Sequence, residues 1–184
     1  NIRENIDANS VVALISTTDP DIGETQTYEL VGGEGNDDNN QFSIDGTLLK
    51  INSSPDYETK STYKIRLKTI DASGLSYEKT FDLSVNNLNE VPTNISSSAD
   101  SFDEQIEAGS IVANLSTTDQ DSDDTHTFEL VEGEGDADNS RFTIADNTIK
   151  INESPDYETQ SSYSIRLKTT DNGGLSYENY FTFD

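Results

Sequence analysis

The second half of this chain repeats the first. When the sequence is shifted by 100 residues, residues 1–84 align with residues 101–184 without a gap, and 46 of the 84 aligned pairs are identical. The best-matched block is the Ser-Pro-Asp-Tyr-Glu-Thr run that begins at Ser54. A repeat of this length indicates two copies of one domain. We therefore expect a first domain over residues 1–89 and a second over residues 90–184.

Within each copy, short runs of β-forming residues are separated by turn residues, and the sequence shows no helical period. In the first copy, the expected strands lie at Glu4–Ile6, Ser10–Thr17, Thr25–Val31, Gln41–Ile44, Thr47–Asn52, Tyr63–Ile70 and Ser76–Val85. Seven strands of this kind predict an all-β fold in which each copy is a Greek-key β-sandwich of the immunoglobulin-like type.

The period-two alternation of strands predicts which residues face the core. On the last two strands, these are Tyr63, Ile65, Leu67, Tyr77, Phe81, Leu83 and Val85. On the second strand, Leu14 is replaced by Asn114 in the second copy, so we expect Leu14 to face solvent. The set expected to face inward stays apolar in both copies and comprises Val11, Ala13 and Ile15 with Ile111, Ala113 and Leu115.

The composition narrows the classes of ligand. Thirty-six acidic residues stand against eleven basic ones, which gives a formal net charge of -25. Such a surface repels nucleic acids and anionic membranes, so cations are the expected partners. The absence of Cys excludes disulfides and thiolate sites for zinc or iron–sulfur clusters. No apolar run reaches membrane-spanning length and the start does not resemble a signal peptide, so we expect no direct membrane contact in this segment.

Most of these carboxylates are expected to be solvated surface residues, but nine oxygen-bearing side chains have positions that suggest a shared site. Loops gather at the two ends of a sandwich, so stacking the copies head to tail would bring two acidic sets together around the linker. The set is Glu4, Asp56, Glu58, Asn87, Asn89, Glu90, Asp119, Asp121 and Asp171. A crowded, all-oxygen set favours calcium over zinc or copper, and over magnesium, which retains more of its waters.

Two further acidic sets lie away from the linker. They comprise Asp19, Asp21 and Asp71 in the first copy and Glu104, Asp156 and Glu158 in the second. Because each of them lacks a second partner set in this sequence, we expect them to bind calcium weakly or to stay empty.

In this order, the acidic motifs resemble those of the cadherin repeat, specifically its bacterial cadherin-like branch. The matching positions are Glu4, Asp19-Pro20-Asp21, Asp56-Tyr57-Glu58 and Asp71, and again Glu104, Asp119-Gln120-Asp121, Asp156-Tyr157-Glu158 and Asp171. The linker from Asn87 to Pro92 is similar to a shorter form of the family's linker, with Asn87 where an Asp is usual. The resemblance implies a cadherin-type sandwich and calcium at the junction, and we expect two or three ions there.

The resemblance also implies a function. We expect a calcium-binding tandem module of a large cell-surface or secreted protein, in which calcium at the junction stiffens the pair into a rod for cell adhesion. The expected location is extracellular or at the cell surface. Besides calcium, the partners considered are other cadherin-like domains and a cell-surface polysaccharide.

Two other functional classes stay open at this point. The chain could be a carbohydrate- or protein-binding module or a passive spacer, although recognition of this kind would need an exposed aromatic platform. The chain has no Trp, and most Tyr and Phe residues fall at inward positions. Catalysis is not expected, because His126 is the only His, Gln26 replaces it in the first copy, and no nucleophile–base set is visible.

Overall fold

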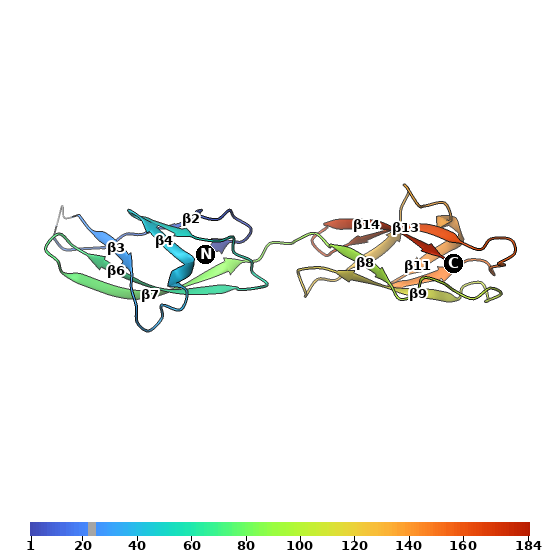
Figure 1. Ribbon diagram of the computed structural model, residues 1–184, viewed down its shortest axis with the longest axis horizontal. Helices are drawn as coiled ribbons and strands as arrows, with labels where there is room; N and C mark the ends of the chain where they lie inside the picture. The colour runs from blue at the N-terminus through green and yellow to red at the C-terminus, as the bar shows by residue number, and fades with distance from the viewer. Residues whose placement is uncertain (22–24) are drawn as a thin grey trace. The chain divides into compact units, whose positions relative to one another are not determined.

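The structure is a computed structural model that describes residues 1–21 and 25–184. It divides into two units, Asn1–Leu88 and Asn89–Asp184, and each unit is built from two β-sheets (Figure 1). The predicted all-β fold with two β-sandwiches is thereby confirmed. The repeat border after residue 89 stays a prediction. No helix among the described residues is long and apolar enough to cross a membrane.

Seven strands are described in the first unit. They are β1 (Ile2–Arg3), β2 (Val11–Leu14), β3 (Thr27–Leu30), β4 (Phe42–Asp45), β5 (Leu48–Ile51), β6 (Thr62–Ile70) and β7 (Ser76–Asn86), with a 3-10 turn, η1, at Asn39–Gln41. One sheet has the order β1-β7-β6-β3 and the other the order β2-β5-β4. The first strand lies earlier than the predicted Glu4–Ile6, because Asn5 adopts a left-handed φ of 59° that ends the extended backbone.

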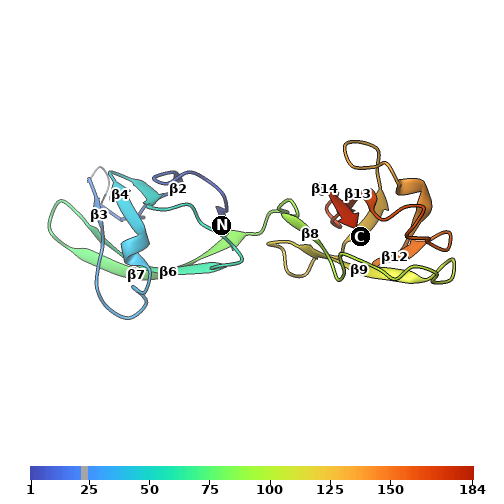
Figure 2. The same ribbon diagram turned by 45° about the vertical axis from the view of Figure 1, so that its right-hand side comes forward.

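The second unit also has seven described strands. They are β8 (Asn94–Ser97), β9 (Ile111–Thr118), β10 (Thr127–Leu130), β11 (Phe142–Ala145), β12 (Thr148–Ile151), β13 (Tyr163–Thr170) and β14 (Ser176–Phe183), with η2 at Asn139–Arg141. The sheets have the orders β11-β12-β9-β8 and β10-β13-β14. Figure 2 shows β8 beside β9, with which it pairs antiparallel. No strand among the described residues of the first unit corresponds to β8.

The core of each unit is centred on its long hairpin, β6–β7 in the first and β13–β14 in the second. Along β6, Tyr63, Ile65 and Leu67 are buried, and their counterparts on β13 are buried as well. The polar residues between them point the other way, as the pleat of a strand requires. The inward face predicted for β6 is confirmed.

On the second strand, the prediction of the inward face is wrong at its first position. Val11 and its counterpart Ile111 are 51% and 56% exposed, whereas Val112 is 9% exposed and belongs to the core. The strand register shifts between Val11 and Ala13, and at the same place in the second unit. A β-bulge of this kind adds one residue to one strand, so the residues before it reverse their faces.

On β7, the predicted inward face holds only at the end of the strand. Val85 is buried, but Tyr77 is 64% and Phe81 38% exposed. The counterparts in the second unit, Tyr177 and Phe181, are half-buried and pack against its core. The two copies of one sequence pattern therefore differ in how well this face is covered.

Candidate metal centre

Three carboxylates come together at one end of the first unit. Oxygen atoms of Glu4, Asp56 and Glu58 lie within 4.8 Å of one another. Glu4 is only 1% exposed, and its side chain accepts the main-chain N–H groups of Tyr57, at 2.7 Å, and of Leu88. Because buried carboxylates require such donors, these contacts fix Glu4 in place.

The loop that carries Asp56 is held by its own short-range contacts. The side chain of Asp56 accepts the N–H of Thr59 at 3.0 Å and its hydroxyl at 2.9 Å. Asp56 is half-buried, and Glu58 is exposed beside it. Asn87, also predicted as a ligand, directly follows β7 and is exposed.

In the second unit, the first two residues of the unit approach two other predicted ligands. The side-chain amide of Asn89 donates to Asp171 at 2.9 Å, and the main-chain N–H of Glu90 donates to Asp121 at 2.8 Å. Asp121 and Asp171 are 7% and 6% exposed. The Asp121 and Asp171 loops are thus joined to the linker by direct hydrogen bonds.

The loop after Asp171 is shaped to receive Asn89. A Cβ atom added at Gly173 would lie 2.1 Å from Oδ1 of Asn89, so only a residue without a side chain fits against this position of Asn89. Gly174 has a φ of 91°, which allows the chain to turn so that Leu175 donates its N–H to Asp171 at 2.8 Å. In the first unit, Ser73 stands where Gly173 does and donates its hydroxyl to Asp71.

A carboxylate absent from the predicted set joins this cluster. Oxygen atoms of Asp119, Asp124 and Asp171 lie within 4.8 Å of one another. Oδ2 of Asp124 is buried and accepts no hydrogen bond from the described residues. Such an atom is costly unless a cation faces it. Together with the all-oxygen donor set, it fits a hard cation such as calcium.

The pKa directions in the second unit reflect this crowding. Burial, followed by the charge of Asp121, raises the pKa of Asp124 above its ordinary value. Burial also opposes ionisation of Asp171, but hydrogen bonds from Asn89 and from the main chain at Leu175 outweigh it and lower the pKa of Asp171. Asp124 is therefore the carboxylate of this cluster whose ionised form is disfavoured when no cation is bound.

His126 has a local structural role. Its Nε2 atom lies 2.8 Å from Oδ2 of Asp119, whose side chain is 3% exposed. Gln26, the equivalent residue, donates to Asp19 at 3.3 Å in the first unit. The same contact is made by two different side chains, which indicates that the residue orients the Asp at this position.

Most carboxylates in the two sets predicted to bind weakly are more exposed than their counterparts. Glu104, Asp156 and Glu158 lie within 4.8 Å of one another, but all three are exposed. In the first unit, Asp21 donates its N–H to Asp19 at 3.0 Å, and Asp71 accepts the hydroxyl of Ser73, which lowers its pKa.

The sequence is similar to that of protocadherin Fat 4 from Mus musculus, with 28% identity over 181 residues, which cover 95% of this chain and 4% of that protein. It is 30% identical to cadherin-3 from Caenorhabditis elegans over 188 residues, which cover 94% of this chain and 5% of that protein. The chain thus spans no more than 5% of the length of these relatives. No protein-family model matches the sequence.

A solved structure supports the fold independently of these sequences. The chain aligns with the crystal structure of human protocadherin-24 EC1-2, form II, with a TM-score of 0.76 and 21% sequence identity. The alignment covers 100% of this chain and 91% of that structure. At this level of identity, the likeness establishes the arrangement of the strands.

Proposed function

Because the chain consists of two tandem cadherin repeats related to the protocadherins and Fat cadherins, we propose that it is a calcium-binding segment of a larger adhesion protein. Cadherin repeats are extracellular adhesion domains, which agrees with the expected location outside the cell and with a non-catalytic role. The assignment to a bacterial branch stays a prediction from the sequence, since the relatives named above are animal proteins.

The linker carries the proposal. Leu88 donates its N–H to Glu4 of the first repeat, while Asn89 and Glu90 donate to Asp171 and Asp121 of the second. Three consecutive residues therefore hold acidic side chains of both repeats. We propose that calcium bound by these acidic sets, with Asp119 and Asp124 included, makes the linker rigid.

The proposed mechanism is electrostatic. Carboxylates held within 4.8 Å of one another repel when they are ionised, and this repulsion favours loosening of the linker. Calcium replaces the repulsion by attraction and satisfies oxygens such as Oδ2 of Asp124. Extracellular calcium modules have dissociation constants of about 10⁻⁴ to 10⁻³ M, so calcium outside a cell would fill such sites.

Calorimetric titration of the metal-stripped chain with calcium tests the proposal. We expect saturable binding, and we expect the double change Asp119→Asn with Asp121→Asn to remove most of the heat. Asp123→Asn combined with Asp146→Asn is the matched control, because it also removes two charges, at exposed residues of the same repeat. An equal loss of binding heat in the control and in the variant of Asp119 and Asp121 would show a general charge effect and contradict a defined site.

Adhesive contacts with other cadherin-like domains are part of the proposal, since the relatives are cadherins. The alternative of protein recognition gains one observation from the structure. Tyr77 and Phe81, predicted to face the core, are exposed in the first repeat.

A further inference from the structure

The turn between β13 and β14 contains an Asn-Gly pair, Asn172-Gly173. No other Asn in the sequence is followed by Gly. Strand β13 pairs with β14 as far as Thr170, which lies opposite Ser176, so the pair lies beyond the end of the ladder. Both residues of the pair are exposed. Water therefore reaches the side-chain amide of Asn172 and the main chain that follows it.

An Asn that precedes a Gly is chemically reactive. The main-chain nitrogen of the next residue can attack the side-chain carbonyl carbon of the Asn, and an ordinary side chain on that next residue hinders the approach. Gly has no Cβ atom, and its backbone adopts conformations that other residues rarely reach. The Asn-Gly pair thus meets the steric requirement for ring closure.

Two other Asn residues of the second repeat are fixed against main-chain groups. The side chain of Asn139 donates to the carbonyl of Val131 at 2.8 Å and accepts the N–H of Arg166 at 2.9 Å. Asn152 donates to a main-chain carbonyl at 3.0 Å. Each of the two is followed by a residue that carries a side chain. They serve as internal references for the reactivity of Asn172.

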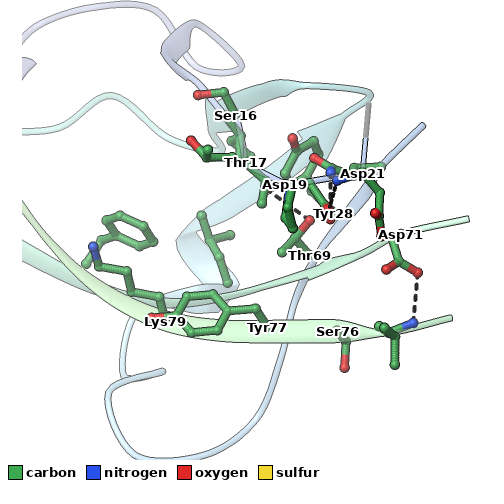
Figure 3. A pocket seen from close by; sticks show the side chains of 17 residues that line it. Ser16, Thr17, Asp19, Asp21, Tyr28, Thr69, Asp71, Ser76, Tyr77 and Lys79 are labelled. Atoms are coloured by element: carbon green, nitrogen blue, oxygen red, sulfur yellow. Dashed lines mark hydrogen bonds between the residues drawn. The ribbon is translucent and has the colours of Figure 1, made fainter. Parts of the chain in front are cut away.

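The first repeat has the same turn with Ala72 and Ser73 in place of the pair. There, Asp71 accepts the N–H of Leu75 at 2.8 Å, as Figure 3 shows, which is the distance of the equivalent bond in the second repeat. The turn therefore forms without Asn or Gly at these two positions. The first repeat thus supplies substitutions that keep the fold and remove the reactive pair.

We infer that Asn172 is a site of spontaneous deamidation. The main-chain nitrogen of Gly173 forms a bond to Cγ of Asn172, the bond from Cγ to Nδ2 breaks, and ammonia leaves with the proton of the Gly173 N–H. The succinimide that results takes up a water molecule. Opening at Cγ gives Asp at position 172, and opening at the main-chain carbonyl carbon gives isoaspartate. The net change is hydrolysis of one amide, without oxidation or reduction.

Both products place a new carboxylate beside an acidic cluster. The side chain of Asn172 donates a hydrogen bond to Asp124, and this donor is lost when the amide becomes a carboxylate. Oxygen atoms of Asp119, Asp124 and Asp171 already lie within 4.8 Å of one another, so a further negative charge adds repulsion in the metal-free chain. The inference itself does not depend on calcium binding.

Peptide mapping by mass spectrometry tests the inference on the complete chain, stored in chelator at neutral pH and physiological temperature. We expect Asn172 to acquire the mass change of amide hydrolysis before Asn139 and Asn152 do, and protein isoaspartate methyltransferase to label the same peptide. Asn172→Ala should abolish this labelling. Gly173→Ser should slow it about tenfold or more, because the new side chain hinders ring closure.

The variant Asn172→Asp reports the effect of the finished product. In chelator, we expect it to melt at a lower temperature than the parent chain, because a charge replaces the donor to Asp124. An unchanged melting temperature would contradict the effect assigned to the product. The inference is overturned if Asn172 stays intact, if Asn139 and Asn152 react as fast as Asn172, or if the Gly173→Ser chain reacts as fast as the parent.

Discussion

Glu4 and Glu104 occupy equivalent positions in the two repeats, yet Glu4 is buried and Glu104 is exposed. Each accepts the N–H of the Tyr in its Asp-Tyr-Glu loop, and Glu4 additionally accepts the N–H of Leu88. Removing a carboxylate from water requires such donors. The environment of this residue is therefore set by the linker that follows the repeat.

The charge of Asp124 should destabilise the metal-free protein and strengthen calcium binding. In chelator at neutral pH, we expect Asp124→Asn to raise the melting temperature, because it removes a charge that faces Asp121, Asp171 and Asp119. With calcium, the variant should melt at a lower temperature than the parent chain. Its affinity for calcium should fall by about tenfold or more, because one charged ligand is lost. Differential scanning calorimetry and titration calorimetry measure the two effects.

The pH dependence of this variant has a definite sign. The pKa of Asp124 is raised in the fold, so its unfavourable charge disappears as pH falls through that pKa. The advantage of Asp124→Asn in chelator should therefore vanish at low pH. Asp123→Asn, at an exposed position, is the control, and an advantage that persists unchanged to low pH would contradict the assignment.

Gly173→Ala should separate calcium affinity from stability. The new Cβ would meet the side chain of Asn89, which is exposed and can turn away. The free energy of unfolding in chelator should therefore hardly change. The Asn89–Asp171 hydrogen bond should be lost and calcium should bind more weakly by titration calorimetry. Gly32→Ala, whose Cβ has only Asn36 within 4 Å, is the control.

Single residues show how far sequence reasoning reaches. Asp121 and Asp171 were identifiable because they recur in both copies, and the structure brings both to the linker. Asp124 was missed because the equivalent residue of the first copy is Glu24, so the two copies share a carboxylate here but not the same residue. Glu24 lies outside the described residues. The exposure of Asn87 could not be foreseen, since it depends on the path of the chain after β7.

At the level of strands, alternation predicts a face only while the pairing is regular. It succeeds on β6, which pairs with β7 along its whole length. It fails on β2 and β9, because a bulge is a property of the paired strands and leaves no mark in a two-residue period. On β7 it fails for another reason, since Tyr77 and Phe81 line an open groove instead of the closed core.

The bulge makes neighbouring residues of one strand respond very differently to truncation. We expect Val112→Ala to lower the free energy of unfolding by about 2 kcal/mol, because Val112 is buried in the core. Ile111→Ala, at an exposed position, should change it by no more than about 0.5 kcal/mol. Urea unfolding of both variants measures the difference, and equal losses would contradict the bulged register.

At the scale of the whole molecule, 36 acidic residues repel one another, so we expect the stability of the fold to depend on bound cations. Calcium should raise the melting temperature, since a ligand at about 100 times its dissociation constant adds about 2.7 kcal/mol to the folded state. It should also narrow the distribution of distances between a dye on each repeat in single-molecule fluorescence. Sodium chloride at matched ionic strength is the control, and distributions unchanged by chelator would contradict a calcium-dependent linker.

The hydrogen bonds of the linker also bear on how this chain can be divided. Leu88 donates to a carboxylate of the first repeat, and Asn89 and Glu90 donate to carboxylates of the second. All three consecutive residues are therefore needed for these contacts. A cut after Asn86 would remove one of the two main-chain donors of Glu4, and a cut before Pro92 would remove the donors that Asn89 and Glu90 supply to Asp171 and Asp121. For grafting or duplication, the first repeat should therefore be cut no earlier than after Leu88, and the second should begin no later than Asn89.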